Sequence, residues 1–448
     1  MSIEVSTATE KIEPTLKARV DRAAYLAGLL KLRPELPEDL AELQGVRDRA
    51  LAIAQELAIP TTRDEEWRFT DLSSLVQINF QPIHDQPTIS FAQIESFILP
   101  EAVNSRLVFV NGTYAPDLSA VDDLPEGVLV TNLSVGVQFL PSLQNYLAKQ
   151  QGAEEVFTAL NTASLIDGAI VHVPKNQSVE TPIQLLFVST TGDTATIAHP
   201  RCLVIAESGS SLTLVEEYAT IGDGGYFTNA VTEIAIAENA QVSHTRVQRE
   251  SEAAFHIGKT AVSQARDSRY ICNAISLGAK ISRHNLEVYQ TGEQTQTTLN
   301  GLTMINGEQV GDIHTKIAFS KPYGTSDQVQ RCIVGDRAHA IFNGKVSVPQ
   351  AAQLTNAAQL SRNLLLSPRA RVDTKPQLEI TADNVKCAHG ATVSQLEDDE
   401  IFYLQSRGLN QAEARKLLTY AFAIEIINHI PVASLKANLT NTIRTQHL

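Results

Sequence analysis

The chain has 448 residues, enough for a large core and for more than one structural unit. Hydrophobic residues make up 43% of it and charged residues 19%, a composition that excludes a disordered or fibrous protein. Acidic residues outnumber basic ones by 50 to 36, and the net charge of −14 argues against binding to a nucleic-acid backbone. Neither a secretory signal pattern in residues 1–13 nor an apolar run long enough to span a membrane is present. We therefore expect no nucleic-acid partner and no membrane association.

The four cysteines, Cys202, Cys272, Cys332 and Cys387, are far apart and form no Cys-x-x-Cys motif. This pattern indicates a reducing, cytoplasmic setting and not a disulfide framework. Three of them stand in apolar, strand-like sequence, which predicts core packing for Cys202, Cys272 and Cys332.

Residues 1–75 are expected to form an N-terminal helical region. Apolar residues at helical spacing predict a first helix that ends before Pro34 and a second that begins near Pro37 and closes at Pro60. The first apolar series is Leu16, Val20, Ala23, Ala27 and Leu30, and the second is Leu40, Leu43, Val46, Ala50, Ile53 and Leu57. The only tryptophan, Trp67, follows in a charged stretch, where we expect it to anchor a helix end with Arg68 paired to an acid.

Residues 76–164 form a mixed connecting region. A short strand from Arg106 runs into an Asn111-Gly112 turn, and residues 157–161 fit a helix end.

From residue 165 to residue 394 short apolar or alternating runs recur between polar turns, without long helical patterns. Loosely similar segments follow these turns at 240–242, 279–281, 338–341 and 370–372. Such degenerate repeats favour stacked strand-turn-strand coils, because no coil buries its apolar face alone. The predicted fold is mainly β, a parallel β-helix (solenoid) with helical regions at both ends, and a β-sandwich is the competing interpretation.

Residues 395–448 are expected to form a C-terminal helical region. Gly408 fits a helix stop, Asn410 and Glu413 make a capping-box pattern, and a last helix presents Leu435, Leu439 and Ile443. The middle helix has a wide apolar face that is typical either of packing on the solenoid or of a partner-docking surface. Its residues are Tyr420, Phe422, Ile424 and Ile427.

The sequence lacks the common catalytic motifs. Gly344-Lys345 is not part of a nucleotide-binding loop, so we expect no ATP hydrolysis by this chain alone, and neither a nucleophile elbow nor a His-Glu-x-x-His motif occurs. A carboxylate pair for polysaccharide cleavage would be assembled from distant coils and leaves no local pattern. The prediction is a non-enzyme, with a polysaccharide-active β-helix enzyme or a purely structural solenoid binding protein as alternatives.

Cys387-Ala-His389 is the best candidate for chemistry. On a strand the thiol and the imidazole point to the same face, where together they suit iron, zinc or copper. Lys386 and a protonated His389 would lower the pKa of the thiol. Two ligands make half a metal site, so the others must come from elsewhere, and a buried structural cysteine beside a hydrogen-bonded histidine is the alternative. His314 and His339 are expected to be surface or core histidines and not ligands.

Several segments resemble the SufB/SufD family of iron–sulfur cluster assembly proteins. The resemblance lies in Glu65-Glu-Trp-Arg-Phe-Thr-Asp-Leu72, in residues 107–112 and 180–183, and above all in residues 361–367, 378–393 and 402–408. The form Lys386-Cys-Ala-His-Gly-Ala-Thr392 is similar to that of SufD-type members, whereas SufB-type members have an acidic context there.

The resemblance implies a right-handed parallel β-helix that acts as a non-catalytic scaffold in the SufBCD complex. It implies a heterodimer with SufB through the β-helix edge and docking of the ATPase SufC on the C-terminal helices, for which Tyr420, Phe422, Ile424 and Ile427 are the candidates. Cys387 and His389 then fall at the interface where clusters assemble, as metal ligands shared with the partner. We expect an iron–sulfur cluster only transiently in the complex and none bound stably by the lone chain; whether the isolated chain forms a homodimer stays open.

Overall fold

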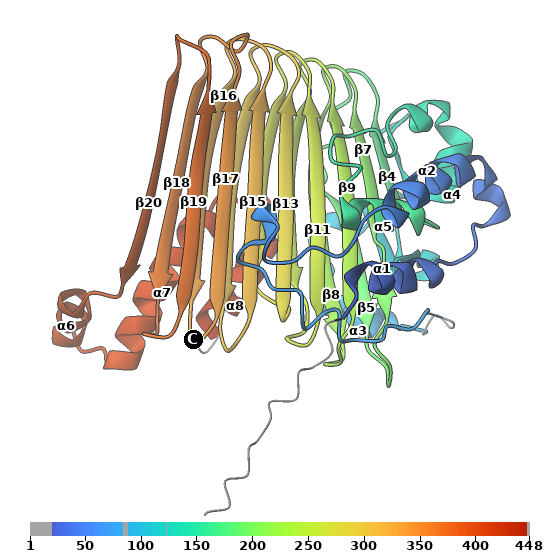
Figure 1. Cartoon of the computed structure of the whole chain (residues 1–448). Coiled ribbons are helices and arrows are strands. Elements are labelled where there is room, and N and C mark those ends of the chain that lie inside the picture. Colours follow the sequence, from blue (N-terminus) through green and yellow to red (C-terminus); the bar gives the residue numbers. More distant parts are fainter. Residues whose placement is uncertain (1–19, 84–87, 123, 446–448) are drawn as a thin grey trace, which may run out of the picture.

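The computed structural model describes residues 20–83, 88–122 and 124–445. Two long sheets face each other, and the chain passes from one to the other so that each coil adds a strand to both (Figure 1). Along the coils every pair of neighbouring strands is parallel, for example β8 with β10 and β9 with β11. The predicted β-helix is confirmed, and the sandwich alternative, which requires antiparallel pairs, is wrong.

The two sheets have the following strands. In order, the first sheet contains β2 (Thr113–Tyr114), β1 (Arg106–Val110), β5 (Ile183–Thr190), β8 (Ser211–Ile221), β10 (Gln241–Arg249), β12 (Arg269–Ser276), β14 (Gln296–Ile305), β16 (Thr325–Val334), β18 (Asn356–Leu365) and β20 (Lys386–Gln395). The second contains β19 (Arg371–Ile380), β17 (His339–Val348), β15 (Val310–Phe319), β13 (Ile281–Gln290), β11 (Phe255–Gln264), β9 (Phe227–Ile236), β7 (Arg201–Ala206), β4 (Ala169–Val173) and β3 (Leu129–Asn132), and β6 (Ile197–Ala198) pairs with β9.

The coils stack in register without a fixed repeat length. Equivalent positions on the first sheet lie between 27 and 31 residues apart, as the aligned residues Gln241, Arg269, Gln296, Thr325, Asn356 and Lys386 show. Turns of different length absorb the variation, and this explains why the sequence shows only a loose repeat.

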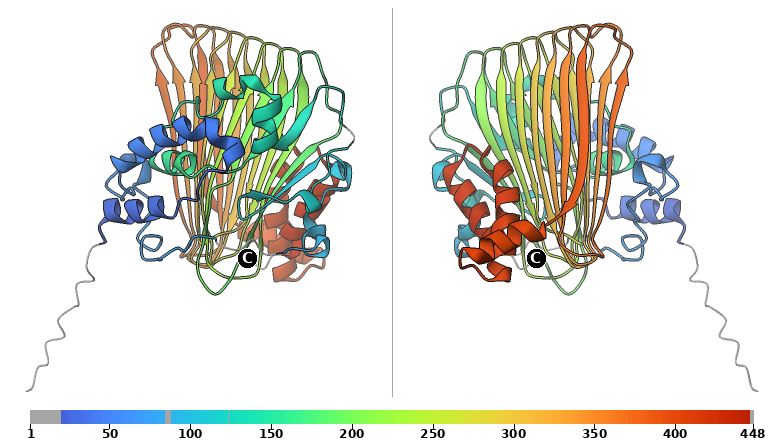
Figure 2. Two further views of the ribbon diagram at one scale, coloured as in Figure 1. Left: turned by 90° about the vertical axis from the view of Figure 1, so that its right-hand side faces the viewer. Right: turned by 90° about the vertical axis from the view of Figure 1, so that its left-hand side faces the viewer.

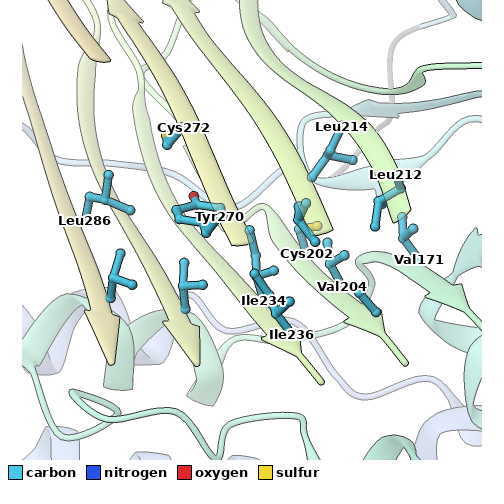
Figure 3. Close-up of a cluster of buried hydrophobic side chains, with 14 of the residues drawn as sticks. Val171, Cys202, Val204, Leu212, Leu214, Ile234, Ile236, Tyr270, Cys272 and Leu286 are labelled. Atoms are coloured by element: carbon cyan, nitrogen blue, oxygen red, sulfur yellow. The ribbon is translucent and has the colours of Figure 1, made fainter. Parts of the chain in front are cut away.

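Strand alternation sends every second side chain into the space between the sheets. The main core cluster there runs the length of the solenoid and includes Val204, Leu214, Ile234 and Leu286 (Figure 3). This core needs no helix to complete it, because each coil covers the apolar face of the next.

The first coils are closed by segments of the same chain. β3 pairs antiparallel with β4, and β1 forms an antiparallel hairpin with β2. The turn of that hairpin is the predicted Asn111-Gly112, with φ values of 51° and 85°. Both pairs end the parallel stacking at this end of the solenoid.

The helices lie outside the two sheets, the N-terminal ones at the first coils and the C-terminal ones along the outside of the first sheet (Figures 1 and 2). They are α1 (Arg22–Lys31), α2 (Gln44–Gln55), α3 (Phe91–Ile94), α4 (Leu133–Phe139), α5 (Val156–Ala163), α6 (Asp398–Ser406), α7 (Gln411–Ile427) and α8 (Ala433–Thr445). A 3-10 turn, Glu38–Leu43, precedes α2 directly after Pro37, and Leu16, which we placed in the first helix, lies outside the described residues together with 1–13. In the described part of the chain no helix is long and apolar enough to cross a membrane.

The predicted C-terminal helix signals are confirmed. Gly408 ends the α6 segment with a φ of 99°, and Asn410 and Glu413 form a complete capping box at the start of α7. Leu435, Leu439 and Ile443 are the buried residues of α8. The same holds for the helix predicted around residues 157–161, which lies within α5.

The close approach of neighbouring coils predicts a specific sensitivity at Gly278. A methyl group there would overlap the backbone of Glu250 in the preceding coil. We expect Gly278→Ala to lower the free energy of unfolding by about 3 kcal/mol, measured by denaturant unfolding. Gly28→Ala is the control: position 28 is open and lies inside α1, so stability should rise by about 0.5–1 kcal/mol. Equal effects of the two substitutions would contradict this account.

Candidate functional site

Cys387 and His389 lie on β20, the last strand of the first sheet. Cys387 aligns with Ala357 and His389 with Gln359 on β18, and both of these β18 side chains are buried between the sheets. Strand alternation therefore turns the thiol and the imidazole inward, side by side, as the sequence predicted. No further coil covers them: Cys387 is partly buried and His389 is exposed.

This end of the solenoid is open. β20 pairs only with β18 and β19 only with β17, so within the described residues both strands have an unpaired outer edge. Val393 on β20 and Ile380 on β19 are 50% and 37% exposed. In the right-hand view of Figure 2 the last strands face the viewer, and the C-terminal helices lie to one side of them. We call this surface the open end; it consists of β19 and β20.

The surroundings of Cys387 differ from the prediction. Burial raises the pKa of the thiol above its ordinary value, and an interaction with the backbone of Ala357 offsets this only in part. Lys386 is the outward, exposed neighbour on the strand, so the expected lowering of the pKa by Lys386 and His389 is wrong. In the isolated chain Cys387 is a protonated, weakly reactive thiol at neutral pH.

The open end offers two metal ligands from this chain. Among the described residues no group of three or more His, Cys, Asp or Glu side chains is placed to hold a metal ion. A thiolate and an imidazole suit iron, but stable coordination needs further ligands.

The other three cysteines are core residues, as predicted. Cys202 and Cys272 belong to the main core cluster (Figure 3), and Cys332 belongs to a smaller one. Burial raises the pKa of Cys332 to about 12 and that of Cys202 well above its ordinary value. These thiols are shielded and unreactive.

A buried polar cluster inside the solenoid was not singled out from the sequence. The Glu216 carboxylate lies 3.1 Å from His244 Nε2 and accepts a bond from Tyr218, and Arg246 contacts His256 at 2.5 Å. Although burial opposes its ionisation, His244 helps to hold the pKa of Glu216 at about 2. Alternation could have placed these side chains inward, but only the register of the coils shows that they meet.

Trp67 and its neighbours fasten the N-terminal segment to the outside of the second sheet. The Arg283 guanidinium lies 3.9 Å above the Trp67 ring, donates to the Glu66 carbonyl at 2.7 Å and pairs with Asp312 at 2.6 Å. The Thr70 hydroxyl donates to Asp312 at 2.6 Å. The expected anchoring by Trp67 is confirmed. Arg68, however, lies over Phe69 and forms no ion pair with another described residue.

His314 connects this segment to the solenoid. Nδ1 lies 3.3 Å from Glu66 and Nε2 lies 3.1 Å from Asp312. Burial and Arg283 lower the pKa of His314, but Asp312 and Glu66 outweigh them and the net shift is upward. Arg283 and His314 in turn hold the pKa of Asp312 below its usual range despite burial. His314 is thus a partly buried histidine on the solenoid wall that bridges Glu66 and Asp312.

The C-terminal helices pack on the outside of the first sheet. Ile427 is fully buried in a cluster with Ile275, Leu302 and Ile333, and three of our docking candidates, Tyr420, Phe422 and Ile424, pack partly buried against it. The guanidinium group of Arg331 on β16 lies 4.6 Å from the centre of the Phe422 ring. It also donates a hydrogen bond of 2.7 Å to the backbone carbonyl of Phe422. In this structure Ile427 is inaccessible to a partner, whereas the docking role of the other three stays a prediction.

Large exposed apolar side chains lie elsewhere on these helices. Phe402 and Tyr403 on α6 are 70% and 56% exposed, and Leu417 on α7 is 45% exposed. The sequence pattern alone does not mark Phe402 as a surface residue. Only packing shows which side of a short helix faces water.

The described residues form a parallel β-solenoid whose last coil is uncovered, with helices from both terminal regions of the chain packed outside it. The SufBD core domain of the SUF system for iron–sulfur cluster assembly matches residues 187–422, and the SufBD N-terminal region matches residues 36–185. The chain belongs to the SufBD family of iron–sulfur cluster assembly proteins.

Similar proteins cover most of the chain. A SufBD family protein of Synechocystis is 45% identical over 94% of this chain and 98% of its own length. The chloroplastic protein ABCI7 of Arabidopsis thaliana is 35% identical over 91% of this chain and 87% of its own. SufD of Escherichia coli is 33% identical over 84% of this chain and 87% of its own. The predicted resemblance to SufD-type proteins and a role in iron–sulfur cluster assembly are thereby confirmed.

The contacts of His314 with Glu66 and Asp312, which we call the histidine bridge, predict a pH-dependent contribution to stability. A raised pKa means that this contribution is complete below the ordinary histidine value of 6.5 and is lost as pH rises through the folded-state value. We expect wild type to exceed His314→Gln in thermal midpoint most at about pH 6, with the difference shrinking toward about pH 9. A difference that stays constant over this range would contradict the bridge.

Proposed function

We propose that this chain is a non-catalytic scaffold subunit of a cluster-assembly complex. Its open end pairs with a SufB-type subunit, and its C-terminal helices dock a SufC-type ATPase. The observation that carries the proposal is the open end itself, where Cys387 and His389 lie uncovered beside an unpaired strand edge. Membership of the family supplies the chemistry, the assembly of iron–sulfur clusters.

The open end is suited to a partner built in the same way. β19 and β20 are ten residues long, and within the described part of the chain each has an outer edge of backbone N–H and C=O groups that pairs with no other strand. Exposed edges of this length are usually blocked or paired in stable proteins. The end face between them carries Leu378 and Cys387, which already pack against the main core. A second solenoid end would pair the backbone and cover the apolar side chains at once.

A partner also completes the chemistry at Cys387. The thiol, with its raised pKa, is a poor ligand in the lone chain. Iron binding displaces the thiol proton, and further ligands from the partner would make such binding favourable. The pair Cys387 and His389 is thus half of a shared site. The cluster is cargo, held transiently in the complex and not by the isolated subunit.

The C-terminal helices can connect an ATPase to this site. The exposed residues Phe402, Tyr403 and Leu417 offer a docking surface on α6 and α7, next to the predicted docking residues Tyr420, Phe422 and Ile424, whose side chains are only partly buried. α7 is tied to the last coils by Arg331, which contacts Phe422, and by Arg415, which donates to the Leu366 carbonyl at 3.1 Å. ATP-driven movement of the docked subunit would shift the last coils and open the shared interface.

Substitution of His389 tests the assembly site. We expect His389→Ala to reduce cluster formation by the complete complex at least about tenfold, because half of this chain's ligand set is lost. Iron and acid-labile sulfide retained by the purified complex are the readout. Thr392→Ala, an exposed residue on the opposite face of the same strand, should leave both unchanged. Unchanged output in His389→Ala would reject the site.

Substitution of Phe402 tests the docking surface. We expect Phe402→Ser to weaken binding of the SufC-type ATPase about tenfold, measured by titration calorimetry with the full chain, because the partner loses an apolar anchor. Phe139→Ser is the matched control, since Phe139 is also 70% exposed but lies on α4 at the other end of the molecule. Equal affinity of the Phe402 variant and wild type would place the docking surface elsewhere.

A further inference from the structure

One corner of the solenoid carries a column of residues with left-handed backbone. We call it the corner column; it lies where strands of the second sheet turn into strands of the first. The φ values are between 56° and 73°, and each backbone N–H donates to a carbonyl of the next coil at 2.7–3.2 Å. The corner column consists of Asn176, Gly209, Asn239, Asp267, Gln294, Tyr323 and Leu354.

The residue types in this column change toward the open end. Glycine has no Cβ, and asparagine and aspartate tolerate positive φ, so they suit the first four positions. Bulky side chains do so poorly, because Cβ approaches the following carbonyl. Tyr323 and Leu354 nevertheless occupy the last two positions, with φ values of 64° and 59°. A strained position that keeps an unsuitable residue indicates a use for its side chain.

Both side chains project into solvent next to the open end. Tyr323 is 52% exposed and Leu354 is 43% exposed. They lie on neighbouring coils, since the Tyr323 N–H donates to the Gln353 carbonyl at 3.0 Å. The Leu354 N–H donates to the Asn384 carbonyl at 2.7 Å, and residue 384 belongs to the turn that leads into β20 and Cys387.

Further apolar side chains are exposed on the last coils. Leu360 on β18 is 39% exposed, and Ile380 and Val393 lie on the open end itself. The C-terminal helices follow the far end of β20 and so lie at the opposite ends of the strands from the corner column (Figure 1). A protein docked on α6 would therefore not reach Tyr323 and Leu354.

We propose that Tyr323 and Leu354 form a rim of the interface with the partner solenoid, on the side of Cys387. The inference rests on the proposed function, because its occupant is the same SufB-type subunit that pairs with the open end. The partner extends past β20, covers the two apolar side chains and thereby seals Cys387 and His389 from water on this side. The strain in the free chain is retained because the same side chains contribute to binding.

Tyr323 and Leu354 strain the free chain but contribute to binding of the partner, so one double substitution should affect stability and affinity in opposite directions. Asparagine is tolerated in left-handed backbone, so Tyr323→Asn with Leu354→Asn relieves strain and removes the apolar surface together. We expect the thermal midpoint of the lone chain to stay equal or rise. We expect the affinity for the SufB-type subunit of the same organism to fall about tenfold, measured by titration calorimetry with both full-length chains.

Gln294→Asn is the matched control. Position 294 has the same backbone conformation in the same column, one coil farther from the open end. This variant should bind the partner as wild type does. If the double variant binds with wild-type affinity, the proposed interface rim is overturned. A clear fall in the thermal midpoint of the double variant also overturns it, because that result would show that the backbone at these positions is unstrained. If wild type itself does not bind the SufB-type subunit, the proposed function fails instead.

Discussion

The structure depends on backbone hydrogen bonding between coils. Each inner strand of the stack forms backbone hydrogen bonds with both of its neighbours, and the in-register alignment from β8 to β20 keeps inward side chains in columns. Such a stack has two ends, and each end strand leaves one edge unpaired. The first end is closed by antiparallel strands and helices of the same chain, whereas the last coil is left open. Within the described residues this asymmetry leaves the last coil as the one uncovered end of the solenoid.

The chemistry at Cys387 follows from its place in this arrangement. A thiol inside the stack, such as Cys332, is sealed and has a pKa raised to about 12. A thiol on a solvated loop would be open to oxidation. Cys387 lies between these cases, half covered by the preceding coil and open on the other side. Its reactivity therefore depends on what covers the last coil, which couples chemistry to assembly.

Polar interactions attach the peripheral segments to the outside of the two sheets. Arg283, Asp312 and His314 hold the segment around Trp67 on the second sheet, and Arg331 holds α7 on the first. Charged contacts of this kind are directional, so they fix where a segment lies more than how strongly it is held. For α7 that placement links the exposed residues of the C-terminal helices to the coils nearest the open end.

Local sequence patterns were enough to predict a mainly β core, the helical ends and the pairing of Cys387 with His389 on one strand face, whereas the parallel pairing of the strands excluded the sandwich. These predictions depend on local signals: alternation, capping at Asn410 and Glu413, and the turn at Asn111-Gly112. Only the three-dimensional packing shows that β20 is an end strand among the described residues, that Lys386 points away from the thiol, that Arg68 lies over Phe69 and that Ile427 is buried. The reason is physical. Periodicity gives the direction of a side chain relative to its own element, whereas its environment is set by coils and helices that are distant in the sequence.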